Sequence, residues 1–132
     1  MIVDTSALVA VMRAEPGYET IVEALELASS REISAASYVE LSAVMGRTAE
    51  RQLAVDETLA GFRVEIVPFD EHQARIAVQA YGRYGRGSGH PARLNLGDVY
   101  SYALASVTGE PLLYVGGDFA RTDVASVLPA TA

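Results

Sequence analysis

The hydrophobic residues of this chain follow two alternating periods, one typical of strands and the other of helices. Short apolar or β-branched runs predict strands at residues 1–3, 31–35, 63–67 and 112–115, with a last extended piece near 124–128. Apolar residues spaced three or four positions apart predict helices at residues 5–12, 21–28, 37–48, 50–60, 70–84 and 95–108. Strands separated by helices usually pair in parallel, so we expect an α/β fold, an α/β/α sandwich around a central parallel sheet of roughly four or five strands.

Local signals predict the ends and faces of these helices. Ser37 and Glu40 have the spacing of a capping box, which predicts that the third helix begins at Ser37. Asn95 and Asp98 have the same spacing at the start of the last helix. Four glycines within residues 82–89 predict a long loop. The inward face of the helix over 70–84 is expected to consist of Ala74, Ala77, Val78 and Tyr81.

The composition mainly excludes certain kinds of site and protein. The chain has 132 residues and no cysteine, which fits a single domain over residues 1–132 and excludes disulfides and thiolate metal sites. It lacks any run of about 18 apolar residues, so we expect no membrane span and a cytoplasmic protein. With only two histidines, any metal is expected to be a hard cation with oxygen ligands. The net charge of −7, with arginine but no lysine in the chain, weighs against nucleic-acid binding.

Acidic residues follow the predicted strands. In a parallel sheet, ligands bind at the edge formed by the carboxyl ends of the strands, which we call the rim. Asp4 comes directly after the first strand, and Glu40 lies on the helix after the second. Asp118 follows the strand at 112–115, and Asp98 opens a helix whose start is expected at the same rim. Taken singly, each of these residues is more often a helix cap or a turn residue than a functional group.

Taken together, the four carboxylates predict a metal site. Converging carboxylates repel one another, and their pKa values rise unless a cation neutralises them. Oxygen-only ligation matches Mg²⁺ or Mn²⁺, and two such ions roughly 4 Å apart can polarise a phosphodiester and generate hydroxide. A bound metal would also add positive charge where a phosphate docks. The set therefore favours a metal-dependent nuclease.

Four blocks of sequence carry a more specific pattern. They are residues 1–8 (MIVDTSAL), 33–40 (ISAASYVE), 90–98 (HPARLNLGD) and 111–123 (PLLYVGGDFARTD). In this order, and over essentially the whole chain, they resemble PIN-domain proteins, specifically the VapC-type toxins of bacterial toxin–antitoxin pairs. The resemblance implies a PIN-like fold and an Mg²⁺- or Mn²⁺-dependent endoribonuclease that hydrolyses RNA phosphodiester bonds.

The resemblance also implies roles for individual residues. The catalytic acids would be Asp4, Glu40, Asp98 and Asp118. The first three would form the metal site, with Asp4 and Asp98 as direct ligands, supported by Thr5, Ser6 and Asn95. Related sequences commonly read Lys-Gly-Asp-Asp-Phe where this chain has Val115-Gly116-Gly117-Asp118-Phe119, so one acid and one lysine of that block are absent.

Partners follow from the same resemblance. The family is usually homodimeric and is held inactive by a cognate VapB-type antitoxin that inserts a segment at the active site. Contact with operator DNA would occur only through that antitoxin.

Arginines in and beside the glycine-rich loop are the candidates for RNA contact. Arg83, Arg86 and Arg93 alternate with Tyr84 and His90. Arginine binds phosphate through paired hydrogen bonds, and tyrosine stacks on unpaired bases. A loop whose charges are simply solvated is an equally open interpretation. His90 is expected to position the loop rather than to act in acid–base chemistry.

Two other functions compete with a ribonuclease toxin. Phosphoryl-transfer domains of the receiver or haloacid-phosphatase type also place Asp at strand ends, but they generally need a lysine, which this chain lacks. The second alternative is an antitoxin-bound regulatory PIN protein with weak or lost nuclease activity, which Gly117 keeps open.

Overall fold

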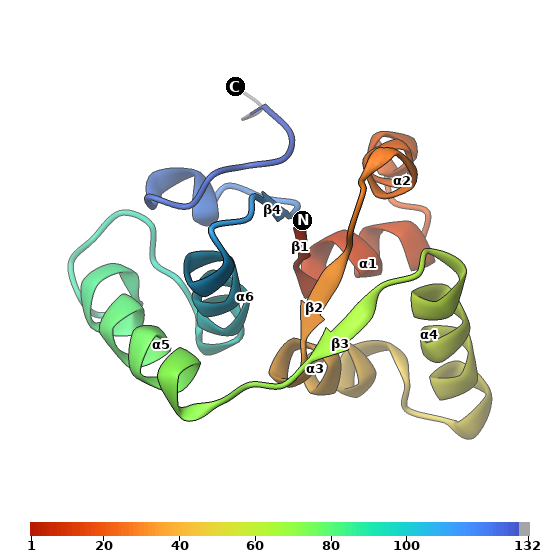
Figure 1. Cartoon of the computed structure of the whole chain (residues 1–132), viewed down its shortest axis with the longest axis horizontal. Helices are drawn as coiled ribbons and strands as arrows, with labels where there is room; N and C mark the ends of the chain where they lie inside the picture. Colours follow the sequence, from red (N-terminus) through yellow and green to blue (C-terminus); the bar gives the residue numbers. More distant parts are fainter. Residues whose placement is uncertain (130–132) are drawn as a thin grey trace.

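The computed structural model describes residues 1–129 and contains a four-stranded parallel sheet in that part of the chain (Figure 1). Its strands are β1 (Ile2–Val3), β2 (Glu32–Ser34), β3 (Glu65–Val67) and β4 (Leu112–Leu113), in the order β3-β2-β1-β4. Ile2 pairs with Glu32 on one side and with Leu112 on the other. A further parallel bridge joins Leu112 to Ser126, within the extended piece predicted near 124–128. The predicted parallel sheet is therefore confirmed.

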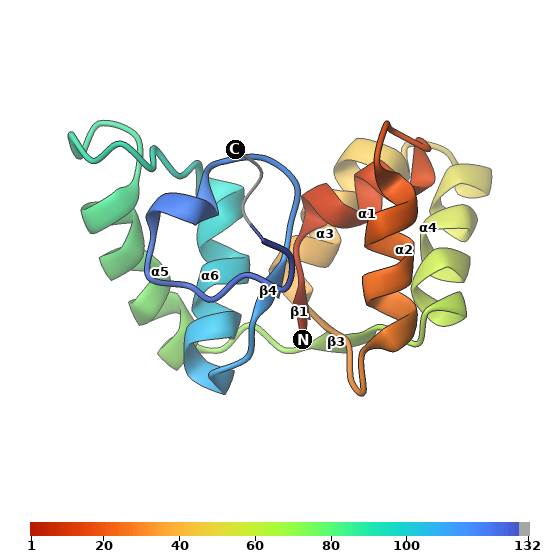
Figure 2. The same ribbon diagram turned by 90° about the horizontal axis from the view of Figure 1, so that it is seen from above.

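Helices cover both faces of the sheet. In chain order they are α1 (Thr5–Met12), α2 (Tyr18–Leu27), α3 (Ala35–Met45), α4 (Ala49–Gly61), α5 (Glu71–Tyr84), α6 (Leu96–Thr108) and the 3-10 helix η1 (Phe119–Arg121). Figure 2 shows α5 and α6 on one side of β1 and β4, and α1, α2 and α4 on the other. The predicted α/β/α sandwich is confirmed. Within residues 1–129, no helix has the length and apolar character needed to cross a membrane.

Successive residues of β1 belong to different hydrophobic cores, because side chains alternate between the two faces of a strand. Ile2 belongs to the core that includes Ala77 of α5. Val3 belongs to the core that includes Leu8 of α1. Both β1 residues are fully buried. The strand thus joins the two layers, and the next residue, Asp4, leaves the sheet at its carboxyl edge.

The start of α3 differs from the predicted one. Ser34, the last residue of β2, caps this helix by accepting a hydrogen bond from the backbone N–H of Ala36 at 3.2 Å. The helix begins directly after the strand, so the capping box predicted at Ser37 and Glu40 is wrong. Two serines three positions apart both fit a helix start by sequence, and the end of the strand decides between them. Ser37 and Glu40 consequently lie inside α3, one turn apart.

The buried face of α5 also differs from the predicted one. Val78 and Tyr81 are 74% and 38% exposed, so their predicted inward orientation is wrong, whereas that of Ala77 is confirmed. Small side chains at the contact let α5 approach α6 closely, which favours this face over the one with larger apolar residues. The buried residues of the helix are Gln73, Ala77, Ala80 and Tyr84.

This orientation of α5 predicts different effects on stability for two neighbouring substitutions. Ala77→Leu adds volume where the side chain is only 5% exposed, and we expect it to lower the free energy of unfolding by about 1–3 kcal/mol. Val78→Leu changes an exposed residue and should stay within about 0.5 kcal/mol of the parent chain. Urea unfolding followed by circular dichroism measures both. Equal destabilisation by the two variants would contradict the observed face.

Candidate metal centre

Asp4, directly after β1, is the most deeply buried of the four acids, with 4% of its surface exposed. It caps α1, because its Oδ2 accepts hydrogen bonds from the Ser6 backbone N–H at 3.0 Å and from the Ser6 hydroxyl at 2.6 Å. The Ser6 oxygen in turn accepts a hydrogen bond at 3.0 Å from the backbone N–H of Val115, just after β4. Ser6 thereby links Asp4 to the end of the neighbouring strand.

The second carboxylate oxygen of Asp4 is held by residues that sequence reasoning missed. Its Oδ1 accepts a hydrogen bond from the Ser101 hydroxyl at 2.6 Å, and the Ser101 oxygen lies 3.2 Å from that of Ser37. Both serines are fully buried, Ser37 on α3 and Ser101 on α6. Their spacing is the signal that could have found them. Ser37 precedes Glu40 by three residues and Ser101 follows Asp98 by three, so each serine shares a helix face with an acid.

Asp98 lies in the first turn of α6, where the predicted capping box is confirmed. The Asn95 side chain accepts from the Asp98 backbone N–H at 2.9 Å, and Asp98 Oδ2 accepts from the Asn95 backbone N–H at 2.9 Å. Burial is the main cause that raises the pKa of Asp98 to about 7. The hydrogen bond from the Asn95 backbone opposes this rise, and the negative charges of the other three acids add to it. Asp98 is thus close enough to each of the other three carboxylates to be repelled by it.

Glu40 reaches the same rim from α3. Its carboxylate lies so close to Gly97, in the first turn of α6, that a Cβ atom at that position would overlap Glu40 Oε2. Burial and the charge of Asp4 raise the pKa of Glu40, whereas the nearby Thr5 hydroxyl lowers it. Gly97 is therefore another residue of the site that sequence reasoning missed, since the absent side chain lets the carboxylate approach α6.

Asp118 is the outlying member of the set. It is exposed and precedes η1 without a side-chain hydrogen bond to that helix. Gly116, two residues earlier, has a φ of 104°, which favours glycine. Gly117 differs, because an added Cβ would have open space around it and the backbone is not left-handed. The backbone at Gly117 would therefore accept an acidic side chain.

The donor set fits a hydrated hard cation better than a closed protein cage. Within residues 1–129, no three histidine or acidic side chains stand close enough together to form a coordination shell by themselves. Mg²⁺ commonly takes only one or two carboxylates and keeps several waters. None of the ion pairs in this part of the chain involves the four acids. Their mutual repulsion is thus not relieved by a basic side chain, and a divalent cation would relieve it.

The arginines proposed to contact RNA lie on exposed surface around the end of α5 and make no ion pair within the described chain. The Arg83 guanidinium carbon lies 4.8 Å from the centre of the Tyr84 ring. Arg93 has a φ of 51°, a left-handed conformation that side-chain-bearing residues seldom adopt. Arg121, which sequence reasoning missed, donates a hydrogen bond to the Pro91 carbonyl at 3.4 Å. The structure thus adds a fourth arginine to the set Arg83, Arg86 and Arg93.

The helix α5 ends at Tyr84, as predicted, and it includes Gly82. The loop to α6 therefore begins at Gly85 rather than at the predicted Gly82. His90 Nδ1 accepts a hydrogen bond from the Ala92 backbone N–H at 3.0 Å. The His90 ring meets the Tyr84 ring edge-on, with 4.8 Å between the centroids. Both contacts are internal to this region, which agrees with a His90 that positions the loop.

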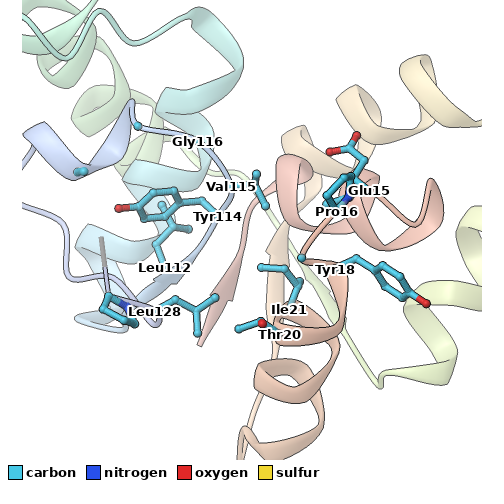
Figure 3. Close-up of a pocket in the computed structure, with 15 residues that line it drawn as sticks. Glu15, Pro16, Tyr18, Thr20, Ile21, Leu112, Tyr114, Val115, Gly116 and Leu128 are labelled. Atoms are coloured by element: carbon cyan, nitrogen blue, oxygen red, sulfur yellow. The ribbon is translucent and has the colours of Figure 1, made fainter. Parts of the chain in front are cut away.

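A groove of about 560 Å³ lies between the turn from α1 to α2 and the end of β4 (Figure 3). Glu15 and Tyr18 belong to one wall, and Tyr114 and Val115 to the other. None of the four acids lines this groove. Val115 nevertheless belongs to both places, because its backbone N–H donates to Ser6. The groove and the acidic rim are therefore neighbours that meet at Val115.

Comparison with known sequences gives matches over nearly the full length. Residues 1–125 match the PIN domain family. The chain is 54% identical over 126 residues to Ribonuclease VapC42 of Mycobacterium tuberculosis. The aligned region covers 94% of this chain and 96% of that protein. The chain is 45% identical to Ribonuclease VapC28 of the same species, with 97% and 98% covered.

Solved structures agree with the observed architecture. VapBC2 from Rickettsia felis bound to a promoter DNA fragment matches with a TM-score of 0.74 and 18% identity, covering 95% of this chain and 94% of that one. Mycobacterium tuberculosis VapC20, described as a toxin that cleaves the sarcin-ricin loop, matches with a TM-score of 0.71 and 19% identity, covering 97% and 98%. At these identities the likeness establishes the fold.

The raised pKa of Asp98 predicts how the stability of the metal-free chain depends on pH. Between the ordinary value of 3.8 and about 7, the folded chain holds a proton that the unfolded chain has released. Stability therefore falls as the pH rises through this window, and the penalty is fully present above about pH 7. Asp98→Asn keeps the capping acceptor without the charge. At pH 8 we expect this substitution to raise the free energy of unfolding by about 1–2 kcal/mol, a value that is reduced because Asp98 is partly exposed. At about pH 4 we expect little effect, because Asp98 is then protonated in the folded chain.

Thermal denaturation at both pH values in EDTA measures this difference. Glu57→Gln, which changes an exposed acid of α4 outside the cluster, is the control and should leave the pH dependence of stability nearly unchanged. The same melting temperature at pH 8 for the parent and Asp98→Asn would contradict the repulsion inferred at this rim.

Proposed function

The chain belongs to the PIN-domain family, and on that premise we propose that it is a divalent-metal-dependent endoribonuclease, the toxin of a type II toxin–antitoxin module. The observation that carries this proposal is the acidic rim, which makes no ion pair with a basic group among residues 1–129 and where the pKa of Asp98 is raised to about 7. Relatives that match over nearly the whole chain carry the name ribonuclease. Hydrolysis of an RNA phosphodiester bond is the reaction that this combination supports best.

We assign the metal site to Asp4, Asp98 and Glu40, with Asp4 and Asp98 as direct ligands and Asp118 as a fourth, outer acid. A bound Mg²⁺, or Mn²⁺, would polarise the phosphodiester and lower the pKa of a water molecule at the site. Asp98 has to release its proton to bind a cation, so binding is favoured as the pH rises toward and above about 7. Glu40 lies on α3, and its carboxylate faces the first turn of α6.

Three polar residues support these acids. Ser6 holds Asp4, and Asn95 holds Asp98, through the hydrogen bonds described above. The Thr5 hydroxyl donates to the Ser37 carbonyl at 3.2 Å, which connects the start of α1 to α3. The first two contacts restrict where a carboxylate can move, and the third holds α1 against α3, the helix that carries Glu40. Such restriction strengthens metal binding.

RNA binding is assigned to Arg83, Arg86 and Arg93. The net charge of −7 would oppose an RNA chain if it were spread evenly. The charge is not spread evenly, because these three residues and Arg121 lie around one loop. Their guanidinium groups are exposed and suited to paired hydrogen bonds with phosphate oxygens. The loop leads directly into α6 and Asp98, so an RNA chain bound along it would pass toward the rim.

We further propose a VapB-type antitoxin as partner, through which alone the toxin would contact operator DNA. The Rickettsia felis VapBC2 structure, which has the same fold, contains a promoter fragment. A homodimer is proposed because Val39 and Leu96 are 67% and 60% exposed, although both are apolar. They directly precede Glu40 and Gly97 in the chain, so a second copy seated there would border the acidic rim.

A regulatory PIN protein with weak or lost nuclease activity is the alternative within the same family. Gly117 favours it, since related sequences carry an acid at that position. The three acids assigned to the metal site are all present, however, and the missing side chain lies beside the outermost of the four carboxylates. We therefore prefer an active nuclease.

Substitution of the two proposed direct ligands tests this function. The purified chain should cleave RNA in Mg²⁺ or Mn²⁺ and stop in EDTA. Asp4→Asn or Asp98→Asn should lower the rate by roughly 100-fold or more, because several kcal/mol of transition-state stabilisation are removed. Glu57→Gln, at an exposed position of α4, is the control. Cleavage that persists in EDTA, or in both variants, would refute the metal mechanism, and an inactive parent chain would favour the regulatory alternative.

Neutralising the loop arginines tests the RNA surface separately. Changing Arg83, Arg86 and Arg93 together to Gln should weaken RNA binding and make it less sensitive to salt, by about 0.7 in the slope of log K against log salt for each phosphate that is no longer neutralised. Fluorescence anisotropy with labelled RNA in EDTA measures binding without cleavage. The matched control changes the exposed residues Arg47, Arg51 and Arg63 to Gln, which removes the same amount of charge. Equal weakening by both triple variants would show that only net charge matters.

A further inference from the structure

A pair of buried hydroxyl groups lies behind the acidic rim. Ser37 and Ser101, which we call the buried serine pair, are both 0% exposed, and their oxygens are 3.2 Å apart. They come from α3 and α6, which lie far apart in the sequence. The Ser101 hydroxyl donates to Asp4 Oδ1 at 2.6 Å, which is a short bond for a hydroxyl and a carboxylate. The pair therefore joins two helices to the residue that ends the central strand.

The direction of these hydrogen bonds follows from the number of protons available. The Ser6 oxygen accepts from the Val115 backbone, so its own proton goes to Asp4 Oδ2, which also accepts from the Ser6 backbone N–H. Both oxygens of Asp4 therefore act as acceptors, and Ser101 has to donate to Oδ1. A serine hydroxyl has a single proton, so Ser101 has none left for Ser37. Ser37 must donate to Ser101, and the chain Ser37–Ser101–Asp4 is polarised in one direction, which strengthens each bond in it.

We propose that Ser101 is a positioning residue for Asp4 and that Ser37 reinforces it; this inference rests on the proposed metal-dependent nuclease. The terminal torsion of an aspartate side chain has a broad energy minimum, so hydrogen bonds decide the plane of its carboxylate. Here Ser6 holds one oxygen and Ser101 holds the other, which leaves the plane with little freedom. Hydrogen bonds that orient a metal-binding group typically change metal affinity by about 10- to 100-fold.

The spacing of the serine pair gives it a second consequence. Ser101 lies one turn after Asp98, and Ser37 lies one turn before Glu40, on the same helix faces. Each helix thus presents a carboxylate at the rim and a hydroxyl behind it. Because the two hydroxyls touch, a shift of either helix would disturb Asp4 as well as its own acid. The serine pair therefore sets the positions of the three assigned carboxylates relative to one another.

Metal binding without RNA is the direct test. We compare Ser101→Ala and Ser37→Ala with Ser106→Ala, which removes an exposed serine from the same helix as Ser101. Isothermal titration with Mn²⁺ should show about a tenfold weaker affinity for Ser101→Ala, a smaller reduction for Ser37→Ala and no change for Ser106→Ala. Ser101→Thr retains the hydroxyl and should recover most of the affinity. Cleavage by Ser101→Ala should be restored by raising the Mn²⁺ concentration, which a damaged fold would not allow.

Crystal structures of the parent and Ser101→Ala, both without metal, give an independent readout. We expect the Asp4 carboxylate to rotate when Oδ1 loses its donor. An unchanged Asp4 together with an unchanged Mn²⁺ affinity would overturn the inference. Should Ser101→Ala not fold, Ser101→Cys keeps a similar volume with a weaker donor, and the same two measurements apply. A parent chain that binds no Mn²⁺ would instead overturn the proposed nuclease, and the orientation of Asp4 would then decide the positioning role alone.

Discussion

A carboxylate buried at the end of the central strand is the constraint on which this structure depends. Removing a charge from water costs several kcal/mol unless hydrogen bonds replace the lost solvent. Asp4 receives those bonds from Ser6 and Ser101, which come from two different helices. The packing of α1 and α6 around β1 is thus tied to a single polar side chain. A fold selected only for stability would not place a charge there, and the other acids at the same rim increase the cost.

The basic groups of residues 1–129 do not form ion pairs with the acids of this rim. The ion pairs of residues 1–129 involve the N-terminus with Glu110 and Arg75 with Glu71, away from the four acids. Burial and mutual repulsion instead raise the pKa of Asp98. The protein in isolation is therefore less stable near neutral pH than its hydrophobic cores alone would make it, and it gains stability from any cation that binds at the rim. Stability and function are in opposition at this place, as is common for sites that bind charged ligands.

Sequence reasoning predicted the parts of the structure that depend on periodicity and on chain order. The alternation of strands and helices predicted the parallel sheet, and the ends of the strands led to Asp4 and Asp118. The cap at Asn95 was also predictable, because only one helix start fits that segment. At α3, two serines fit equally well, and only the observed end of β2 selects Ser34 over Ser37. A local pattern cannot decide between two equivalent local solutions.

The errors and omissions share one physical cause, which is contact between distant segments. Val78 is more hydrophobic than Ala80, yet close packing against α6 buries Ala80. Ser101 is a single hydroxyl in an apolar helix, and nothing near it in sequence shows that Asp4 lies opposite. Gly97 matters only because Glu40 approaches it from another helix. The role of each of these residues depends on a contact with a residue of another segment, which lies far away in the sequence.

The pairing of β1 with β4 has a consequence for how such a protein is made. β1 is synthesised first, but Ile2 and Val3 pair with Leu112 and Leu113, close to the other end of the sequence. A growing polypeptide therefore carries Asp4 before Asp98, Ser101 and β4 have been made. Domains fold as units once their distant contacts are available. An RNA-cutting enzyme with this topology stays unassembled until the segment from α6 to β4 has been translated, because that segment supplies Asp98, Ser101 and the strand that pairs with β1.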